Sequence, residues 1–270
     1  MDARFPQEII DTIVDHLSAF NVIRIFTALR LTSREFDLSC RRHIFRNIVL
    51  NRRRCTVSCA YSRKLYEILL SNSDIVPLIK NLRIDLIDYL APSLSTSIPD
   101  PNDYIPRVLR QITRLAALQI EGLPPLQWNE WPSDLRSALR TLFASPCLSS
   151  LLLQRITSIP TSLFDSCPTL KSLTLDEVTF VDDLPGILQS RPCLESPKFI
   201  TIAGPHPFAR GLPADLTGLR NLDFSHVSAA DGKILWETYI EPSSTSLVTL
   251  SIITMGLSTS VLRELFHLQS

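Results

Sequence analysis

Large apolar residues recur along most of the chain in a four-slot pattern, apolar-x-x-apolar-x-apolar-x-x-apolar. Seven copies are present, and only Pro197, in the fifth copy, interrupts the set of large apolar side chains. The last four copies follow their predecessors at intervals of 22, 24, 25 and 28 residues, a period typical of stacked strand–helix units. The copies begin at Ile79, Leu115, Leu148, Leu170, Leu194, Leu219 and Leu247.

The pattern predicts one short strand in each copy, because alternate residues of a strand point to the same face. The second and third slots, such as Leu82 and Ile84, would then enter a shared core. A unit of this size cannot bury its own apolar face, whereas stacked units bury a continuous one. The expected fold class is therefore α/β, with a curved parallel sheet and helices on its convex side. The helices are predicted over residues 133–144, 160–166, 184–190 and 231–239, with Pro160 in a first turn.

Two intervals between copies are longer, at 36 and 33 residues. One contains residues 91–106, which are rich in proline, serine and aspartate, and the other contains residues 122–132, with Trp128 and Trp131. Proline and small polar residues favour turns and loops. We interpret both segments as loop-like insertions.

From about residue 75 onward, the chain resembles the leucine-rich-repeat family, which implies a solenoid of this strand–helix kind. In that family the fourth slot usually holds asparagine or cysteine, and a ladder of asparagines satisfies the backbone of the turns. Here the fourth slot is apolar in every copy, so we expect turns of less regular geometry. The residues in this slot are Ile87, Leu123, Ile156, Val178, Ile202, Val227 and Met255.

The first fifty residues show helical periodicity instead. Pro6 and Glu8 suit the first turn of a helix, since proline presets the helical φ and glutamate complements the helix dipole. A second apolar segment covers residues 22–29, and a third begins near Ser33, a candidate N-cap. Three such helices expose apolar side chains unless they dock on another surface. The stripe of the first helix comprises Ile9, Ile10, Ile13, Val14 and Leu17.

A second resemblance rests on the run Phe5-Pro6-x-Glu8-Ile9-Ile10-x-x-Ile13-x-x-x-Leu17 and on Leu31-Thr32-Ser33-Arg34-Glu35-Phe36. Together they look like an F-box, and residues 42–50 are similar to the tail of many fungal F-box proteins. Phe5 stands where the family has leucine, and no proline follows the first helix. The resemblance implies binding to the Skp adaptor, and through it to the cullin, of a ubiquitin ligase.

Carried over by position, the F-box resemblance implies a set of adaptor contacts in the three helices. Part of this set could instead hold the helices together, the role that we expect for Val14, Phe26 and Leu29, which lie outside the set. The implied contacts are Phe5, Pro6, Ile9, Ile10, Ile13, Leu17, Val22, Ile25 and Leu31.

Residues between the core slots would face the concave side of the sheet and select a protein substrate. One column of these residues contains Arg83, Gln119, Leu152, Thr174, Lys198, Asp223 and Ser251. Its neighbour contains Asp85, Glu121, Gln154, Asp176, Ile200, Ser225 and Ile253. The acidic start of the second column favours a basic substrate segment, although an ordinary solvated strand end has the same composition. The candidate substrate contacts are Arg83, Asp85, Gln119, Glu121, Gln154, Asp176, Lys198 and Asp223.

The charge balance argues against general nucleic-acid binding, which rests on neutralising phosphates. Lysine plus arginine and aspartate plus glutamate both number 27. An arginine-rich run over residues 41–54 follows the three helices and leaves open a helix-turn-helix interpretation. A solvated face between the helices and the repeats explains the same run without a DNA partner.

Several features predict a location in the cytoplasm, the nucleus or both. The six cysteines have no small-domain disulfide pattern, which fits a reducing compartment. No stretch approaches the roughly 20 apolar residues needed to cross a bilayer, and residues 1–8 lack the layout of a secretory signal. We therefore expect neither secretion nor a membrane partner.

No motif in the sequence supports catalysis, a metal site or a cofactor. Cys55 and Cys59 lie near His43, but no second ligand pair has zinc spacing. No serine lies in a nucleophile-elbow pattern, and the seven glycines form no phosphate-binding loop. We expect a protein that is not an enzyme.

Two hypotheses about function follow. The first is a substrate-recognition subunit of a Skp–cullin–F-box ubiquitin ligase, with an F-box-like module over residues 1–50, a connecting helical segment over 51–74 and repeats over 75–270. The second is a leucine-rich scaffold outside any ligase, whose N-terminal helices cap the first repeat. Leu265 and Leu268 begin a further copy, so we expect a frayed last unit or a longer parent protein.

Overall fold

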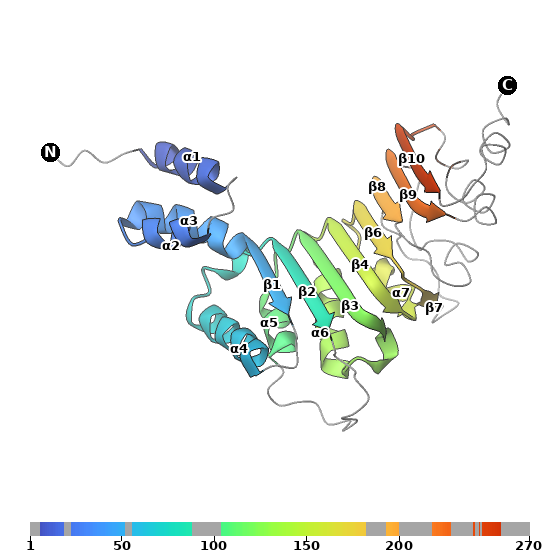
Figure 1. Cartoon of the computed structure of the whole chain (residues 1–270), viewed down its shortest axis with the longest axis horizontal. Coiled ribbons are helices and arrows are strands. Elements are labelled where there is room, and N and C mark those ends of the chain that lie inside the picture. The colour runs from blue at the N-terminus through green and yellow to red at the C-terminus, as the bar shows by residue number, and fades with distance from the viewer. Residues whose placement is uncertain are drawn as a thin grey trace.

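A computed structural model describes residues 6–18, 23–51, 56–87, 104–181, 193–199, 218–227, 240, 243 and 245–254 of the chain. Within these residues, eight strands form one sheet in which all pairs are parallel and neighbours follow chain order (Figure 1). Two short strands, β5 (Ile159–Pro160) and β7 (Phe180–Val181), pair with each other outside that sheet. The strands of the main sheet are β1 (Asn47–Asn51), β2 (Asn81–Ile87), β3 (Ala117–Gln127), β4 (Ser150–Thr157), β6 (Ser172–Asp176), β8 (Ser196–Phe199), β9 (Asn221–Val227) and β10 (Thr249–Thr254).

The strands pair in the register that the four-slot pattern predicts. Leu82, Leu118, Leu151 and Leu173 are successive direct partners on β2, β3, β4 and β6, and all four are buried. Pro197 on β8 lies opposite Leu173, so the interrupted slot stays in register. The prediction of an α/β fold with a parallel sheet is therefore confirmed.

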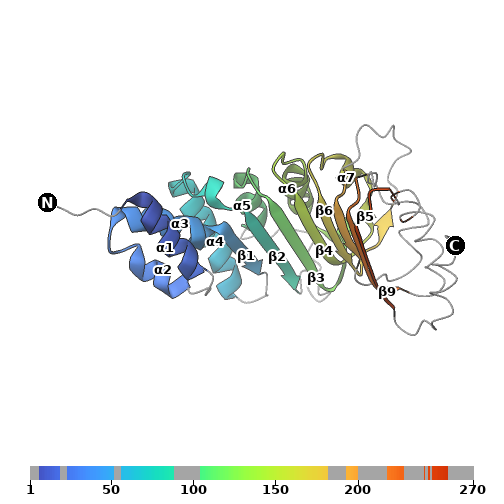
Figure 2. The same cartoon turned by 90° about the horizontal axis from the view of Figure 1, so that it is seen from above.

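Helices line one face of the sheet, and neighbouring helices pack on one another in chain order (Figure 2). The opposite face, called the open face below, carries no helix of the described part of the chain (Figure 2). The helices predicted over 133–144 and 160–166 are present as α6 and α7, while those predicted over 184–190 and 231–239 lie outside the described residues. The helical elements after β1 are α4 (Thr56–Ser71), η1 (Val76–Leu78), α5 (Ile105–Gln111), η3 (Trp128–Glu130), α6 (Ser133–Phe143) and α7 (Ser162–Asp165).

One hydrophobic cluster fills the space between the sheet and the helices, from Ile48 on β1 to Leu222 on β9 and Ile240. Each large apolar side chain that is fully buried contributes roughly 1.5–3 kcal/mol relative to solvent exposure. Because the cluster is continuous, every strand–helix unit depends on its neighbours for burial. In α6 the buried residues recur at helical spacing and are Leu135, Ala138, Leu139, Leu142 and Phe143.

The sheet begins one strand earlier than the predicted boundary at residue 75. Ile48 on β1 is buried and pairs directly with Leu82 on β2. The helix predicted within residues 51–74 is present as α4, but it packs against α5 as a member of the helix layer. The segment after Arg46 is therefore the first strand–helix unit, and not the tail of the N-terminal helices followed by a connector.

Residues 122–132 do not form the predicted loop. β3 continues through them to Gln127, with a bulge between Glu121 and Leu126 where the pairing with β4 shifts register. Trp128 and Trp131 follow and are both buried, with ring centroids 4.8 Å apart, because the two indoles fill the core beside α6. Of the other predicted insertion, residues 91–103 lie outside the described residues, and α5 begins directly after Tyr104.

The backbone near the ends of the strands varies from unit to unit. Arg155 and Glu177 have φ angles of 55° and 53°, a left-handed conformation that non-glycine residues adopt at an energetic cost. On β3 the corresponding residue is Gly122, where a Cβ atom would lie 2.5 Å from the carbonyl oxygen of Arg155. The start of α7 also differs from the prediction, since Pro160 belongs to β5 and Thr161 is the N-cap residue.

Candidate protein-interaction surfaces

Three N-terminal helices form a small unit with a core of its own, called the helical module below. The helices α1 and α2 each pack against α3 (Figure 1). Ser33 caps α3 as predicted, because its Oγ accepts a hydrogen bond from the backbone N–H of Phe36. Ile10, Val14, Phe26 and Cys40 form the core, and Leu17, Leu29, Phe36 and Ile44 pack around it. The helices are α1 (Gln7–Ser18), α2 (Ile23–Leu29) and α3 (Arg34–Arg46).

Most of the adaptor contacts that the sequence implies remain open to solvent. Ile9, Ile13, Ile25 and Leu31 have exposed fractions of 46%, 43%, 38% and 82%, and Pro6 is exposed as well. Ile9 and Ile13 lie one turn apart on α1, so their side chains are neighbours on the helix surface. These residues leave the module with apolar side chains that its own core does not use.

Of the other four implied contacts, the structure describes two, and neither is exposed to the same extent. Ile10 is only 4% exposed and belongs to the core, so the prediction that it contacts a partner is wrong. Leu17 is half-buried, and Phe5 and Val22 lie outside the described residues. Leu38 on α3 is 53% exposed and is a further apolar side chain that the F-box pattern does not select.

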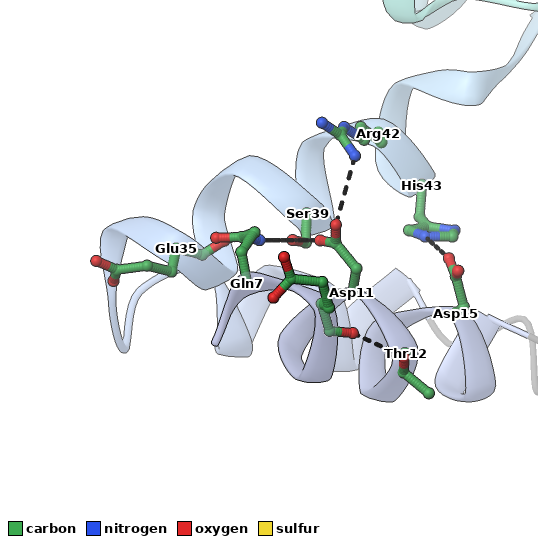
Figure 3. Close-up of polar contacts among 9 residues, drawn as sticks. Gln7, Asp11, Thr12, Asp15, Glu35, Ser39, Arg42 and His43 are labelled. Carbon is green, nitrogen blue, oxygen red and sulfur yellow. Dashed lines mark hydrogen bonds and ion pairs between the residues drawn. The ribbon is translucent and has the colours of Figure 1, made fainter. Parts of the chain in front are cut away.

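Polar contacts on one edge of α1 hold it against α3 (Figure 3). The side-chain amide of Gln7 donates to Ser39 Oγ at 2.8 Å and to Asp11 Oδ1 at 2.9 Å. The Ser39 hydroxyl also donates to Asp11, and Arg42 forms an ion pair with Asp11 at 3.7 Å. Gln7 and Asp11 are four residues apart and share one face of α1, so that this face turns toward α3.

A second contact lies one turn further along α1. His43 Nε2 is 2.8 Å from Asp15 Oδ1 (Figure 3). The imidazole of His43 stacks on the ring of Phe26 in the module core, with centroids 5.4 Å apart. The contacts of α3 therefore connect both α1 and α2.

Part of the arginine-rich run predicted as a solvated face is used inside the molecule. Arg41 pairs with Asp37 at 2.9 Å and with Asp74, just before η1, at 3.2 Å. α3 continues directly into β1, and the backbone N–H of Lys80 donates to the carbonyl of Arg46 at 3.0 Å. These contacts join the module to the sheet without an intervening linker.

The stability contribution of Asp11 is expected to fall at low pH. Hydrogen bonds from Ser39 and Gln7 lower the pKa of Asp11 below its ordinary value of 3.8, against the opposing effect of burial. A carboxyl with a lowered pKa stabilises the folded state above its unfolded pKa and loses this effect as pH falls through its folded pKa. Urea unfolding of the native chain and Asp11→Asn should therefore show a constant difference above about pH 5 that shrinks below 3.8. A difference unchanged down to about pH 2 would contradict this assignment.

On the open face, the members of each column predicted from the sequence are direct register partners on neighbouring strands. Arg83 pairs with Gln119 in register, and Asp85 pairs with Glu121. Arg83 lies between two carboxylates, with Nε 2.6 Å from Asp85 Oδ1 and Nη2 2.8 Å from Glu121 Oε2. Asp85 is only 7% exposed, and its carboxylate holds the side chain of Arg83. The prediction that Asp85 itself contacts a substrate is therefore wrong.

Further along the sheet, the remaining candidates form isolated pairs. Gln154 Nε2 donates to Asp176 Oδ2 at 2.7 Å, and Lys198 pairs with Asp223 at 2.9 Å. The sequence columns do not include Arg155 and Glu177, whose side chains pair at 3.3 Å. Because these two residues have a left-handed backbone, they do not follow the alternation of strand side chains that defines the columns.

Comparison with known proteins adds no relative: no protein-family model matches the chain, and no curated protein is significantly similar to it in sequence. Across the described residues, no group of three or more His, Cys, Asp or Glu side chains could hold a metal ion. No helix among them is long and apolar enough to cross a bilayer. Among the described residues, the exposed apolar residues of the module and the polar open face are the two candidate interaction surfaces considered below.

Proposed function

We propose that the chain is the substrate-recognition subunit of a Skp–cullin–F-box ubiquitin ligase. In this proposal the helical module is an F-box that binds the Skp adaptor, and the sheet with its helices is a leucine-rich-repeat solenoid that binds a protein substrate. One observation carries the proposal. Four residues at positions implied by the F-box resemblance, Ile9, Ile13, Ile25 and Leu31, are apolar and exposed on a module with a separate core.

Exposed apolar side chains on a unit this small support a protein partner. Each side chain contributes roughly 1.5–3 kcal/mol when it passes from full exposure to full burial. Association and ordering cost several kcal/mol or more, so a few well-buried anchors carry most of the affinity. Leu31, which is the most exposed of the four, and the adjacent pair Ile9 and Ile13 have the largest area left to bury.

The solenoid part of the proposal is supported by the order of the strands and by the single layer of helices. Consecutive strands are neighbours, and α4, α5, α6 and α7 pack in sequence. The direct passage from α3 into β1, together with the Arg41–Asp74 ion pair, would hold a substrate on the open face at a set position relative to the adaptor.

The test is direct binding of the purified full chain to a purified fungal Skp adaptor. We expect a one-to-one complex in size-exclusion chromatography and a saturable isotherm in calorimetry. Absence of a complex at micromolar concentrations of both proteins would refute the adaptor assignment.

The contacts between module and sheet also favour a second candidate, a scaffold outside any ligase in which the module caps the first unit. This candidate predicts a monodisperse chain that binds no adaptor. It also predicts that deletion of residues 1–32 lowers the unfolding temperature of the remaining sheet. Adaptor binding with no effect of the deletion on the sheet would exclude it.

A further inference from the structure

We propose that the open face binds an extended, basic protein segment with two lysine or arginine residues three positions apart. That this segment belongs to a ubiquitination substrate rests on the function proposed above, whereas the chemistry of the surface does not. The open face carries an excess of negative charge, its two acidic positions have a set spacing, and short uncharged side chains lie beside them.

Carboxylates outnumber cations in the two columns. Arg83 is shared by Asp85 and Glu121, so one negative charge remains there. In the described part of the chain, the Asp176 carboxylate accepts a hydrogen bond from the neutral amide of Gln154, which leaves its charge in place. The charged members of the columns are Asp85, Glu121, Asp176, Asp223, Arg83 and Lys198.

The remaining pair on the face is balanced, because Lys198 and Asp223 neutralise each other. The excess of two negative charges is therefore local to β2, β3 and β6. The whole chain carries 27 basic and 27 acidic residues, so the excess is a property of this surface and not of the composition. A surface of one sign attracts a partner of the other sign and repels its own.

The positions of the two charges set the spacing of their partners. Glu121, Gln154 and Asp176 are direct register partners on three neighbouring strands. With strands about 4.8 Å apart, the two acidic positions are about 10 Å apart across the sheet. In a polyproline II segment, residues i and i+3 share one side and lie about 9.3 Å apart. A segment crossing the strands in this conformation can place one cation near each carboxylate.

The neighbouring column leaves room for such a segment to approach. At the position two residues before Arg83 and its equivalents, every strand carries a short side chain without charge. Two of these amides already bond along the column, Asn81 to Asn47 at 2.6 Å and Asn221 to Ser196 at 3.0 Å. The column consists of Asn47, Asn81, Ala117, Ser150, Ser172, Ser196, Asn221 and Thr249.

The test uses the full chain and fluorescein-labelled twelve-residue peptides built from glycine, serine and a central Lys-Pro-Pro-Lys. Fluorescence anisotropy is expected to show saturable binding that weakens as salt rises. Glu121→Gln and Asp176→Asn should each weaken binding about fivefold, since each removes one negative charge from the open face. Asp134→Asn, which removes an exposed carboxylate from α6 on the helix face, should leave binding unchanged.

Two further peptides make the outcome decisive. A Glu-Pro-Pro-Glu peptide should not bind, and a peptide with adjacent lysines should bind several-fold more weakly than Lys-Pro-Pro-Lys. Equal binding of the acidic peptide, no binding of the basic one, or equal losses from Asp176→Asn and Asp134→Asn would overturn the proposal. Adaptor binding of the same variants, expected to be unchanged, separates the two proposals because it does not involve the open face.

Discussion

Replacing Ile9 and Ile13 together with aspartate is expected to weaken binding of the Skp adaptor about a hundredfold while the chain stays folded. Both side chains are near half exposure in the free chain, and the proposed interface buries the remainder. Losing that burial and placing two carboxylates in an apolar contact costs about 3 kcal/mol or more, which corresponds to roughly a hundredfold in affinity. The measurement is a calorimetric titration of each chain with adaptor.

The folded state tolerates the double substitution because neither side chain belongs to the module core. Aspartate at position 9, in the first turn of α1, also complements the helix dipole. The matched control places aspartate at Thr12 and His16, which are exposed positions of the same helix without apolar side chains. Unchanged affinity of Ile9→Asp with Ile13→Asp, or an equal loss in the control, would remove these isoleucines from the interface.

The sheet could be predicted because its pattern is strict. Strand residues alternate between two faces, so the positions of Leu118 and Leu151 in their copies determine both burial and register. The same pattern does not detect β1, because Arg53 occupies the fourth slot and because the strand directly follows a helix. Only its pairing with β2 reveals the strand.

The module shows where helical periodicity stops being informative. The stripe from Ile9 to Leu17 identifies α1 as amphipathic, but it is too wide to say which members face the other helices. The contacts of Asp11 with Ser39 and Arg42 turn one edge of α1 toward α3. This rotation buries Ile10 and leaves Ile9 exposed, and it depends on residues about 30 positions away in the chain.

The open face could be predicted by position but not by charge. The alternation places Arg83 and Glu121 on the same surface, while the pairing that partly neutralises them joins residues 38 positions apart. The sequence of the second column therefore predicted more net negative charge near β2 than the pairing with Arg83 leaves. The carboxylate on β6, which the structure pairs with an amide, retains the charge that the sequence suggested.

Leu151→Ala is expected to lower the free energy of unfolding by about 3–5 kcal/mol, the cost of deleting a fully buried leucine side chain that leaves a cavity. Leu151 is 0% exposed and lies between Leu118 and Leu173 in the centre of the sheet. The next residue, Leu152, points to the open face and is half-buried, so Leu152→Ala should cost less than about 1 kcal/mol. Urea unfolding followed by circular dichroism measures both.

The neighbouring pair separates the role of burial from that of composition, because both substitutions remove the same atoms from the same strand. Units in such an array contact only their neighbours, so the cavity left by Leu151→Ala should loosen β3 and β6 first. Compared with the native chain, the variant should show a larger increase in amide exchange rate at Leu118 and Leu173 than at Ile48, which lies on the outermost strand of the sheet. Equal destabilisation by the two substitutions would mean that β4 does not present alternate residues to core and solvent, and the columns of the open face would lose their basis.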